Sequence, residues 1–175
     1  MQGRTVLLGV TGSIAAYKAV ELASKLVQGG AMVDVVMTNC AAQFVTPLTF
    51  RSVTHRPVIT DMFAAPEGYD IEHIALAERA DAVVVAPATA NVMAKLAAGI
   101  ADDMLCCAIL ATRSPIILAP AMNVHMWENG ITQKNLDSLR ARGFKTVEPG
   151  YGALACGGVG RGRLADLEDI VTAIR

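Results

Sequence analysis

Short, continuous runs of apolar residues recur along the chain, and longer segments of mixed character separate them. Six runs have the length of strands: residues 6–10, 32–37, 57–60, 81–86, 116–119 and 145–147. Continuous rather than alternating apolar runs are typical of strands that are buried on both faces, as in parallel sheets. The pattern therefore predicts an α/β fold, a doubly wound six-stranded parallel sheet of Rossmann-like or flavodoxin-like type with helices on both faces. We expect one domain over residues 1–175.

The segments between the strands carry helix signals. Helices are expected over residues 15–26, 41–52, 74–80, 92–98, 132–142 and 166–174, and a further one is expected to begin within residues 99–103. Ser13 is placed to cap the first helix, and Pro47 is expected to interrupt the second. Residues 151–164 contain five glycines, so we expect no regular element there.

The composition narrows the functional classes. The chain has 175 residues, of which 53% are hydrophobic and 18% charged, and its net charge is −1. A nearly neutral chain without a basic run offers no electrostatic basis for binding nucleic acid. The abundance of apolar residues leaves apolar surface that favours a homo-oligomer. No uninterrupted apolar run reaches the length of a membrane span, so no membrane association is expected.

The cysteines and the first residues favour a reduced, cytoplasmic protein. Cys40, Cys106, Cys107 and Cys156 lack the spacing of metal ligands, and an adjacent pair is a poor disulfide framework. We therefore expect no metal site. The first residues form a strand pattern rather than a signal peptide, which agrees with a cytoplasmic location.

Small polar residues follow four of the predicted strands, at residues 12–13, 38–39, 89–91 and 121–123. Because the carboxyl ends of parallel strands meet at one edge of a sheet, these clusters are expected to line one shared site. Their hydroxyls, amides and glycines suit a phosphate held at helix N-termini beside a flat ring with a polar edge. Flavin mononucleotide (FMN) fits better than NAD, because no acidic residue follows the second strand to bind a ribose.

Three segments carry candidate chemistry. Residues 120–127 read P-A-M-N-V-H-M-W and place an amide, Asn123, directly after the fifth strand. His73 stands near the start of a predicted helix, and Cys156 stands in the glycine-rich segment near two arginines, where a thiol is accessible and reactive. Taken alone, the first segment also fits a capped strand end that packs methionine and tryptophan, and His73 also fits a structural histidine.

These motifs resemble the homo-oligomeric flavin-containing cysteine decarboxylases. Residues 120–127 are similar to that family's P-x-M-N-x-x-M-W signature, and residues 87–92, P-A-T-A-N-V, are similar to its P-A-S-A-N-T flavin motif. His73 stands where the family keeps its active-site histidine. Residues 10–18 and 155–164 are most similar to the branch that acts on 4'-phospho-N-pantothenoylcysteine in coenzyme A synthesis. The second of these segments resembles a substrate clamp with a reactive cysteine.

The resemblance implies FMN-dependent decarboxylation of that small molecule to 4'-phosphopantetheine and CO2, through a thioaldehyde and an enethiol. It implies that His73 is the base, that Cys156 donates a proton, and that Asn123, Met126 and Ala121 bind the substrate. The residues expected to bind FMN are Gly12, Ser13, Ile14, Thr38, Asn39, Thr89, Ala90, Asn91, Ala121 and Met122. It also implies a trimer or larger homo-oligomer with FMN near the subunit interface. Phosphopantothenate–cysteine ligase is implied as a fused or cooperating partner.

The sequence alone leaves other readings open. A peptidyl-cysteine decarboxylase that acts on the C-terminus of a precursor peptide, a flavin prenyltransferase and a non-catalytic FMN-binding regulatory subunit share this fold. Cys156 and the glycine-rich segment around it argue against the peptide-acting enzymes. The substrate phosphate requires a cation, and the sequence does not choose among the candidates, which are Arg161, Arg163, Lys95 and Arg79.

Overall fold

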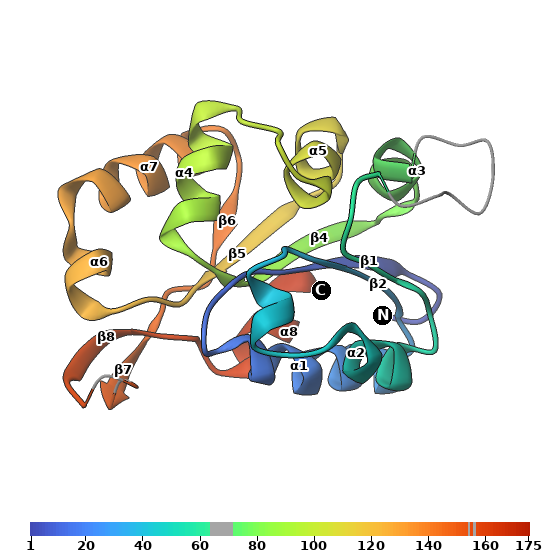
Figure 1. Ribbon diagram of the computed structural model, residues 1–175, viewed down its shortest axis with the longest axis horizontal. Coiled ribbons are helices and arrows are strands. Elements are labelled where there is room, and N and C mark those ends of the chain that lie inside the picture. Colours follow the sequence, from blue (N-terminus) through green and yellow to red (C-terminus); the bar gives the residue numbers. More distant parts are fainter. Residues whose placement is uncertain (64–71, 154, 156) are drawn as a thin grey trace.

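The computed structural model describes residues 1–63, 72–153, 155 and 157–175. Its centre is a six-stranded sheet in the order β3-β2-β1-β4-β5-β6, in which every pair of neighbours is parallel. The strands are β1 (Thr5–Val10), β2 (Met32–Met37), β3 (Val58–Ile59), β4 (Ala82–Ala88), β5 (Ile116–Pro120) and β6 (Lys145–Thr146). The predicted doubly wound parallel sheet is confirmed (Figure 1).

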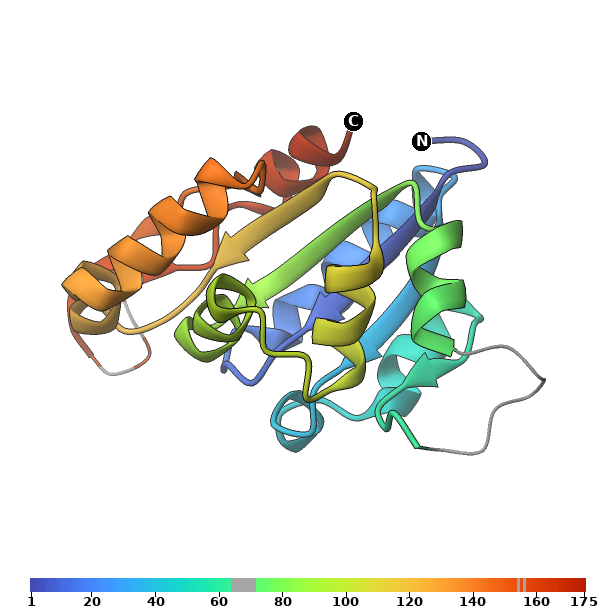
Figure 2. The same cartoon turned by 90° about the horizontal axis from the view of Figure 1, so that it is seen from above.

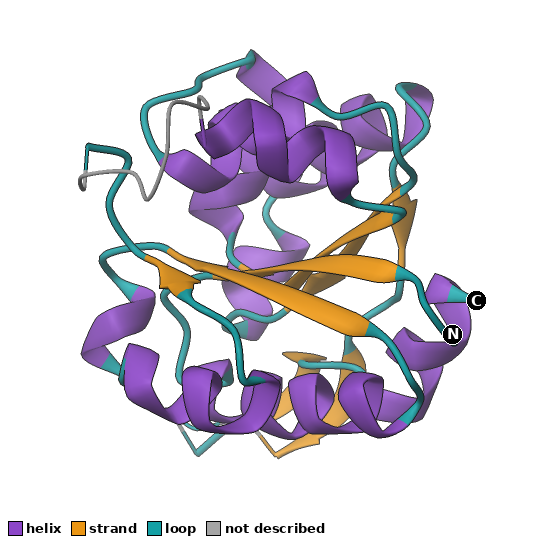
Figure 3. Ribbon diagram, turned by 90° about the vertical axis from the view of Figure 1, so that its right-hand side faces the viewer, coloured by secondary structure: helices purple, strands orange, loops and turns teal. Residues whose placement is uncertain are grey.

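Helices cover both faces of the sheet, as Figures 1 and 3 show. One layer contains α1 (Ala16–Gln28), α2 (Pro47–Thr54) and α8 (Leu167–Ile174). The other layer contains α3 (Glu72–Arg79), α4 (Ala90–Ala98), α5 (Met104–Ala111) and α7 (Gly130–Ala141). Two short elements, η1 (Ala41–Gln43) and α6 (Val124–Glu128), follow the ends of β2 and β5. Among the described residues, no helix is both long enough and apolar enough to cross a membrane.

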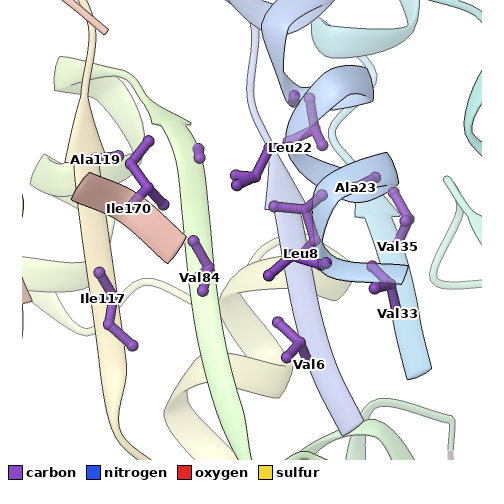
Figure 4. Packing of buried hydrophobic residues seen from close by; sticks show 14 of the residues in the cluster. Val6, Leu8, Leu22, Ala23, Val33, Val35, Val84, Ile117, Ala119 and Ile170 are labelled. Carbon is purple, nitrogen blue, oxygen red and sulfur yellow. The ribbon is translucent and has the colours of Figure 1, made fainter. Parts of the chain in front are cut away.

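Strand side chains alternate between two hydrophobic cores. Val6 and Leu8 of β1 pack toward α1 and α8, where they join Leu22 and Ile170 (Figure 4). Leu7, between them, faces the opposite layer. Every residue of β1 and of β4 is buried, because both strands lie in the middle of the sheet with helices above and below. This double burial is the physical reason for the continuous apolar runs in the sequence.

The strand order reverses between β1 and β4. The chain leaves β1 toward β2 and β3, and it leaves β4 toward β5 and β6. The loops that follow these two strands therefore diverge, and a crevice opens between them at the carboxyl edge of the sheet. This edge is where the predicted polar clusters lie.

The expectation of no regular element within residues 151–164 is wrong. Strands β7 (Gly150–Ala153) and β8 (Val159–Arg163) form a separate antiparallel pair below α6 (Figure 1). The glycines of β8 allow the β7–β8 pair to pack closely against another segment of the chain. An added Cβ on Gly160 would lie 2.8 Å from a methyl carbon of Val124. Close packing rather than disorder explains the composition.

The predicted cap of α1 and the predicted start of α5 are also wrong. Helix α1 begins at Ala16 with no side-chain cap, and the Ser13 hydroxyl instead accepts a 3.2 Å hydrogen bond from the N–H of Ala15. Gly99 ends α4 in the left-handed conformation, and α5 begins five residues later, after Asp103 caps it by accepting from the N–H of Cys106. The predicted interruption near Pro47 is confirmed, since η1 and α2 are separate.

Candidate functional site

A cavity of about 730 Å³ opens at the carboxyl ends of β1, β2 and β4. It is called the first cavity below. Nearly all of the residues that the sequence assigned to FMN line it, namely Gly12, Ser13, Thr38, Asn39, Thr89, Ala90, Asn91, Ala121 and Met122. Ile14 does not. The structure thus brings together four polar clusters that lie far apart in the sequence, and the volume is within the range of small-molecule sites.

Thr11 joins the two central strands at the rim of this cavity. Its buried hydroxyl donates to the carbonyl oxygen of Pro87 at 2.6 Å and accepts from the N–H of Thr89 at 3.1 Å. The Thr89 hydroxyl in turn caps α4 by accepting from the N–H of Val92. These bonds fix the ends of β1 and β4 relative to each other, so the crevice between them is preorganised.

The walls of the first cavity fit FMN. A Cβ on Gly12 would lie 2.4 Å from the Cβ of Cys40, so only glycine lets the turn after β1 pack this closely on the segment after β2. The Thr38 hydroxyl accepts from the N–H of Ala41 at 3.2 Å, which orders that segment. Hydroxyls, amides and backbone groups on these turns match a phosphate, a ribityl chain and the polar edge of an isoalloxazine ring.

One wall of the first cavity carries an ion-pair cluster. The Lys95 ammonium lies 2.6 Å from Asp102 and 3.1 Å from Asp103. The hydrogen bond to Asp102 raises the pKa of Lys95, and the same bond lowers the pKa of Asp102. Potential ligand atoms of Asp102, Asp103 and Cys106 lie within 4.8 Å of one another. Because the Lys95 ammonium already pairs with both carboxylates, we interpret the group as an ion-pair cluster rather than a metal site.

A second cavity of about 660 Å³ lies on the other side of the Ser13 turn. It is lined by Ile14 and Asn123, together with Lys18 of α1 and Arg163 of β8. The two cavities share Ser13, Ala121 and Met122 in their walls. The two cavities are therefore adjacent.

Asn123 is held at the boundary of this second cavity. It is the N-cap of α6, where its side-chain oxygen accepts from the N–H of His125 at 2.9 Å. The preceding residue, Met122, donates its N–H to the carbonyl oxygen of Gly162 in β8 at 2.8 Å. An N-cap on one side and the β8 strand on the other thus fix the position of the amide.

The remaining predicted site residues lie elsewhere. Met126, expected at the substrate, lines the first cavity and is half-exposed. His73 lies in the first turn of α3, is partly buried and lines neither cavity. Figure 1 places α3 and α6 at opposite ends of the molecule. Cys156 lies outside the described residues. Within one chain, the structure does not bring His73 to Asn123.

Sequence reasoning missed several residues that line the cavities. In the first, these are Thr60, Asp61, Met62 and Phe63, which follow β3. In the second, they are Tyr17 and Lys18. Tyr17 and Lys18 belong to the segment 10–18 that contributes to the resemblance, but the sequence assigned neither side chain a role, because nothing in it placed β8 beside α1.

Cys106 and Cys107 have structural surroundings. Burial raises the pKa of the Cys106 thiol to about 12, and Asp103 beside it acts in the same direction. Burial also raises the pKa of Cys107, whose thiol contacts the sulfur of Met62 at 3.6 Å. Both are protonated at neutral pH. Cys106 belongs to the buried core, as the sequence predicts, whereas the same prediction is wrong for Cys107, which is half-buried and lies outside the core.

Curated relatives cover the whole chain. The Bacillus subtilis (strain 168) coenzyme A biosynthesis bifunctional protein CoaBC is 51% identical over 98% of this chain, which spans 42% of that relative's length. The probable phosphopantothenoylcysteine decarboxylase of Streptococcus mutans is 45% identical, and the match covers 98% of this chain and 97% of that protein. The chain therefore spans less than half of the bifunctional relative but nearly all of the shorter one.

Solved structures agree. One, described as a PPC decarboxylase mutant complexed with pantothenoylaminoethenethiol, superposes with a TM-score of 0.90 at 33% identity, covering 98% of this chain and 96% of that one. The FMN-dependent cysteine decarboxylase SpaF superposes with a TM-score of 0.86 at 34% identity, covering 98% and 95%. These likenesses confirm the resemblance drawn from residues 87–92 and 120–127. The Flavoprotein family matches residues 1–175, and the chain belongs to that family.

Proposed function

We propose that this chain is an FMN-dependent decarboxylase that converts 4'-phospho-N-pantothenoylcysteine to 4'-phosphopantetheine and CO2. The observation that carries the proposal is the shared wall of the two cavities. The first cavity is lined by the residues expected to bind FMN, and the second by Asn123. The relatives named for this reaction, or for coenzyme A biosynthesis, and the FMN-dependent structural relative support the same assignment.

Decarboxylation requires that the electron pair left on the carbon that carried the carboxylate be stabilised. Loss of CO2 leaves an electron pair on Cα, and FMN supplies the remedy when bound, because it accepts hydride from Cβ and later returns it. The Cβ–thiol is thereby oxidised to a thioaldehyde, whose C=S group conjugates with the electron pair on Cα. The product of CO2 loss, once its sulfur is protonated, is an enethiol.

Asn123 is assigned to the substrate carboxylate. A neutral amide orients the anion without stabilising it so strongly that CO2 departure is impeded. The cap to His125 and the bond between Met122 and Gly162 keep the amide in place, so its orientation costs little at the moment of reaction. Ala121 and Met122, shared by both cavities, bring the substrate Cβ against the ring.

We assign the proton transfers to His73 and Cys156. His73 takes the thiol proton as hydride leaves Cβ, a role that suits an imidazole near neutral pH. Cys156 donates a proton to Cα of the enethiol, so that hydride can return to Cβ and the thiol product forms. His73 returns its proton to the sulfur, which CO2 loss leaves as an enethiolate, and Cys156 regains its proton from solvent, so the reaction balances and FMN is not consumed.

The location of His73 supports a composite site in a homo-oligomer of three or more subunits. His73 lines neither cavity of its own chain, so we place the histidine of one subunit opposite Asn123 of the next. Exposed apolar side chains accompany both surfaces, with Ile74 beside His73 and with Ile14 and Tyr17 at the second cavity. Contact between subunits would cover them. We further propose a single catalytic domain in the cytoplasm that works with, or is fused to, phosphopantothenate–cysteine ligase.

The test is to reconstitute the protein with FMN and measure CO2 and thiol products from 4'-phospho-N-pantothenoylcysteine. A peptide ending in cysteine serves as the competing substrate. We expect the small molecule to be turned over and the peptide to be inert. In Cys156→Ser, CO2 should still be released while the enethiol accumulates in place of the thiol. The proposal is wrong if FMN-loaded protein releases no CO2 from the small molecule, or releases it only from the peptide.

A further inference from the structure

We propose that Lys18 of α1 and Arg163 of β8 bind the phosphate group of the substrate in the second cavity. This inference rests on the proposed function, since it names the residues that recognise one end of that substrate. Both side chains line the cavity that contains Asn123. Lys18 was not among the cations that the sequence suggested.

The structure removes three of the four cations that the sequence offered. Arg79 is in the last turn of α3, and its Nε lies 2.7 Å from the buried carboxylate of Asp34. The Lys95 ammonium is bound between Asp102 and Asp103 in the first cavity. Arg161 lines neither cavity. Only Arg163 remains of the original candidates.

Lys18 and Arg163 keep hydrogen-bond donors for a ligand. Within the described part of the chain, no carboxylate forms an ion pair with the Lys18 ammonium. Among the described residues, the one carboxylate that approaches Arg163 is that of Asp166, at 3.6 Å, which is longer than a hydrogen bond, and Asp166 is 80% exposed. A planar guanidinium and an ammonium from two different elements can therefore both donate to one phosphate.

The charges around the two cavities indicate which cavity binds the phosphate of the substrate and which binds the phosphate of FMN. The described walls of the second cavity contain Lys18 and Arg163 and no acidic residue. The first cavity contains Lys95 together with Asp61, Asp102 and Asp103. A dianionic phosphate monoester is therefore more favourable in the second cavity, where no carboxylate opposes it. FMN also carries a phosphate, but its predicted binding residues line the first cavity, so we assign Lys18 and Arg163 to the substrate.

The size and polarity of the second cavity fit an elongated substrate. A volume of about 660 Å³ is typical of sites that enclose a small molecule. The cavity offers an amide at Asn123 for the carboxylate and two cations for the phosphate. The other residues of its walls are mostly small or apolar, including Ile14 and Ala153, which suits the pantothenoyl chain.

The experiment compares two substrates that differ only in the phosphate, 4'-phospho-N-pantothenoylcysteine and N-pantothenoylcysteine. In FMN-loaded Lys18→Gln, we expect kcat/KM for the phosphorylated substrate to fall by about 10- to 100-fold, mostly through KM, because a charge-assisted hydrogen bond is lost. With the substrate that lacks phosphate, kcat/KM should stay within about twofold of the wild-type value. Arg163→Gln should behave similarly, and Lys18→Arg should restore most of the preference for phosphate.

Arg161→Gln is the matched control, because it removes a cation from the same strand without altering either cavity. It should keep the wild-type ratio of the two kcat/KM values. Equal losses on both substrates in Lys18→Gln would overturn the proposal, and so would loss of the preference in Arg161→Gln. A rise in the Kd for FMN with an unchanged substrate ratio would also overturn it, because the phosphate bound by Lys18 would then be that of the cofactor.

A binding measurement separates this inference from the proposed function. Calorimetric titration with 4'-phosphopantetheine and with pantetheine reports phosphate recognition without turnover. If the wild-type protein binds the phosphorylated ligand more tightly and Lys18→Gln abolishes that difference, the phosphate site stands even where no CO2 is released. If the wild-type protein binds both ligands equally, the phosphate site is refuted even where CO2 is released.

Discussion

The hydroxyl of Thr11 donates a 2.6 Å hydrogen bond to the carbonyl oxygen of Pro87 and so links the carboxyl ends of β1 and β4. These neighbouring strands flank the point where the strand order of the sheet reverses. The same hydroxyl accepts from the N–H of Thr89, the residue that caps α4. One buried side chain thus joins the two loops that border the first cavity.

We expect Thr11→Val to lower both stability and FMN affinity. Valine has nearly the shape of threonine but cannot donate, so the Pro87 carbonyl and the Thr89 N–H lose their buried partner. The free energy of unfolding should fall by about 1–3 kcal/mol, measured by urea denaturation without FMN. The Kd for FMN, from flavin fluorescence, should rise because the two loops are no longer fixed. Thr11→Ser keeps the hydroxyl and should resemble the wild type, and equal behaviour of the two variants would contradict this role.

We expect Gly162→Ala to impair catalysis while sparing the cofactor. A Cβ at Gly162 would lie 2.2 Å from the carbonyl oxygen of Met122, and its φ of +143° is rare for other residues. Strand β8 must then move and break its bond to the Met122 N–H, which releases the neighbouring Asn123. We predict that kcat/KM falls at least about tenfold, the cost of a slightly misplaced binding group, with the Kd for FMN little changed.

Gly158→Ala provides the control for Gly162→Ala. An added Cβ at Gly158 meets nothing within 4 Å, so this variant should keep wild-type kcat/KM. Both variants remove one glycine from the same segment, and a general loss of chain flexibility would affect both. If Gly158→Ala loses as much activity as Gly162→Ala, close packing of β8 against Met122 is not the cause.

The fold could be predicted because strands that are buried on both faces form continuous apolar runs in the sequence. All six residues of β1 and all seven of β4 are buried, and such strands must be apolar throughout. The site formed by the polar turns after these strands could also be predicted, because residues that follow parallel strands all lie at the carboxyl edge of the sheet. The residues assigned to FMN therefore line the first cavity, all except Ile14, whereas nothing in the sequence indicated a site at the lining residues 60–63 after β3.

The rest of the site depends on contacts between segments that are distant in sequence. The pairing of β7 with β8 was hidden by their glycines, which packing against Val124 and Met122 requires. The position of Lys18 beside Arg163 follows only once β8 lies near α1. The sequence correctly predicted that His73 lies near the start of a helix. Within one chain, however, His73 does not line the second cavity. These features are tertiary, and no local pattern encodes them.

We expect Asn123→Asp to abolish substrate binding without unfolding the protein. Aspartate is as good an N-cap as asparagine, so the bond to the His125 N–H survives and the free energy of unfolding should stay within about 0.5 kcal/mol of wild type. A second carboxylate facing the substrate carboxylate costs several kcal/mol. We predict a fall in kcat/KM of roughly 100-fold or more at pH 7, measured by CO2 release.

Asn129→Asp tests whether the change of charge alone matters. Asn129 caps α7 by the same geometry, since its side-chain oxygen accepts from the N–H of Ile131 at 2.9 Å. It lines neither cavity. This variant should therefore match the wild type in both stability and kcat/KM. A comparable loss of activity in Asn129→Asp would show that the effect at Asn123 is not specific to the substrate.

We expect alkylation to distinguish Cys106 from Cys40. The pKa of Cys106 is raised to about 12, first by burial and second by Asp103. Only the thiolate reacts, so at pH 8 only about one thiol in ten thousand is reactive, and the fraction rises only as the pH approaches 12. Cys40 is exposed and lines the first cavity. Mass spectrometry after iodoacetamide treatment should find Cys40 modified and Cys106 unmodified.

FMN adds a second readout to the alkylation experiment. Because Cys40 lines the first cavity, saturating FMN should slow its modification severalfold, while Cys106 should stay unreactive with and without FMN. The unfolded protein in urea should react at both cysteines, which verifies that each can be detected. Equal rates at Cys40 with and without FMN would place the cofactor elsewhere, independently of any activity measurement.

We expect two inactive variants to complement each other. If His73 of one subunit acts beside Asn123 of the next, then His73→Asn and Asn123→Asp each destroy every site in a pure oligomer. In an oligomer mixed at random from equal amounts, a site is intact when its asparagine comes from the His73→Asn subunit and its histidine from the Asn123→Asp subunit. Among oligomers selected to contain both variants, this occurs at about one of the three interfaces of a trimer and approaches about a quarter in larger oligomers. Co-expression with two affinity tags, tandem purification and the CO2 assay would measure it.

The size of the recovered activity carries the argument for a composite site. Complementation near about a third of the wild-type rate for a trimer, or about a quarter for a larger oligomer, requires that the imidazole and the amide come from different chains, because no single chain in the mixture contains both. The control is an oligomer in which every subunit is His73→Asn and the two tags are on different copies. It should remain inactive, which excludes effects of tagging and purification. If the mixed oligomer is as inactive as its parents while its FMN content equals that of the wild type, His73 does not act across the interface. The placement of α3 far from α6 (Figure 2) would then exclude His73 from the chemistry altogether.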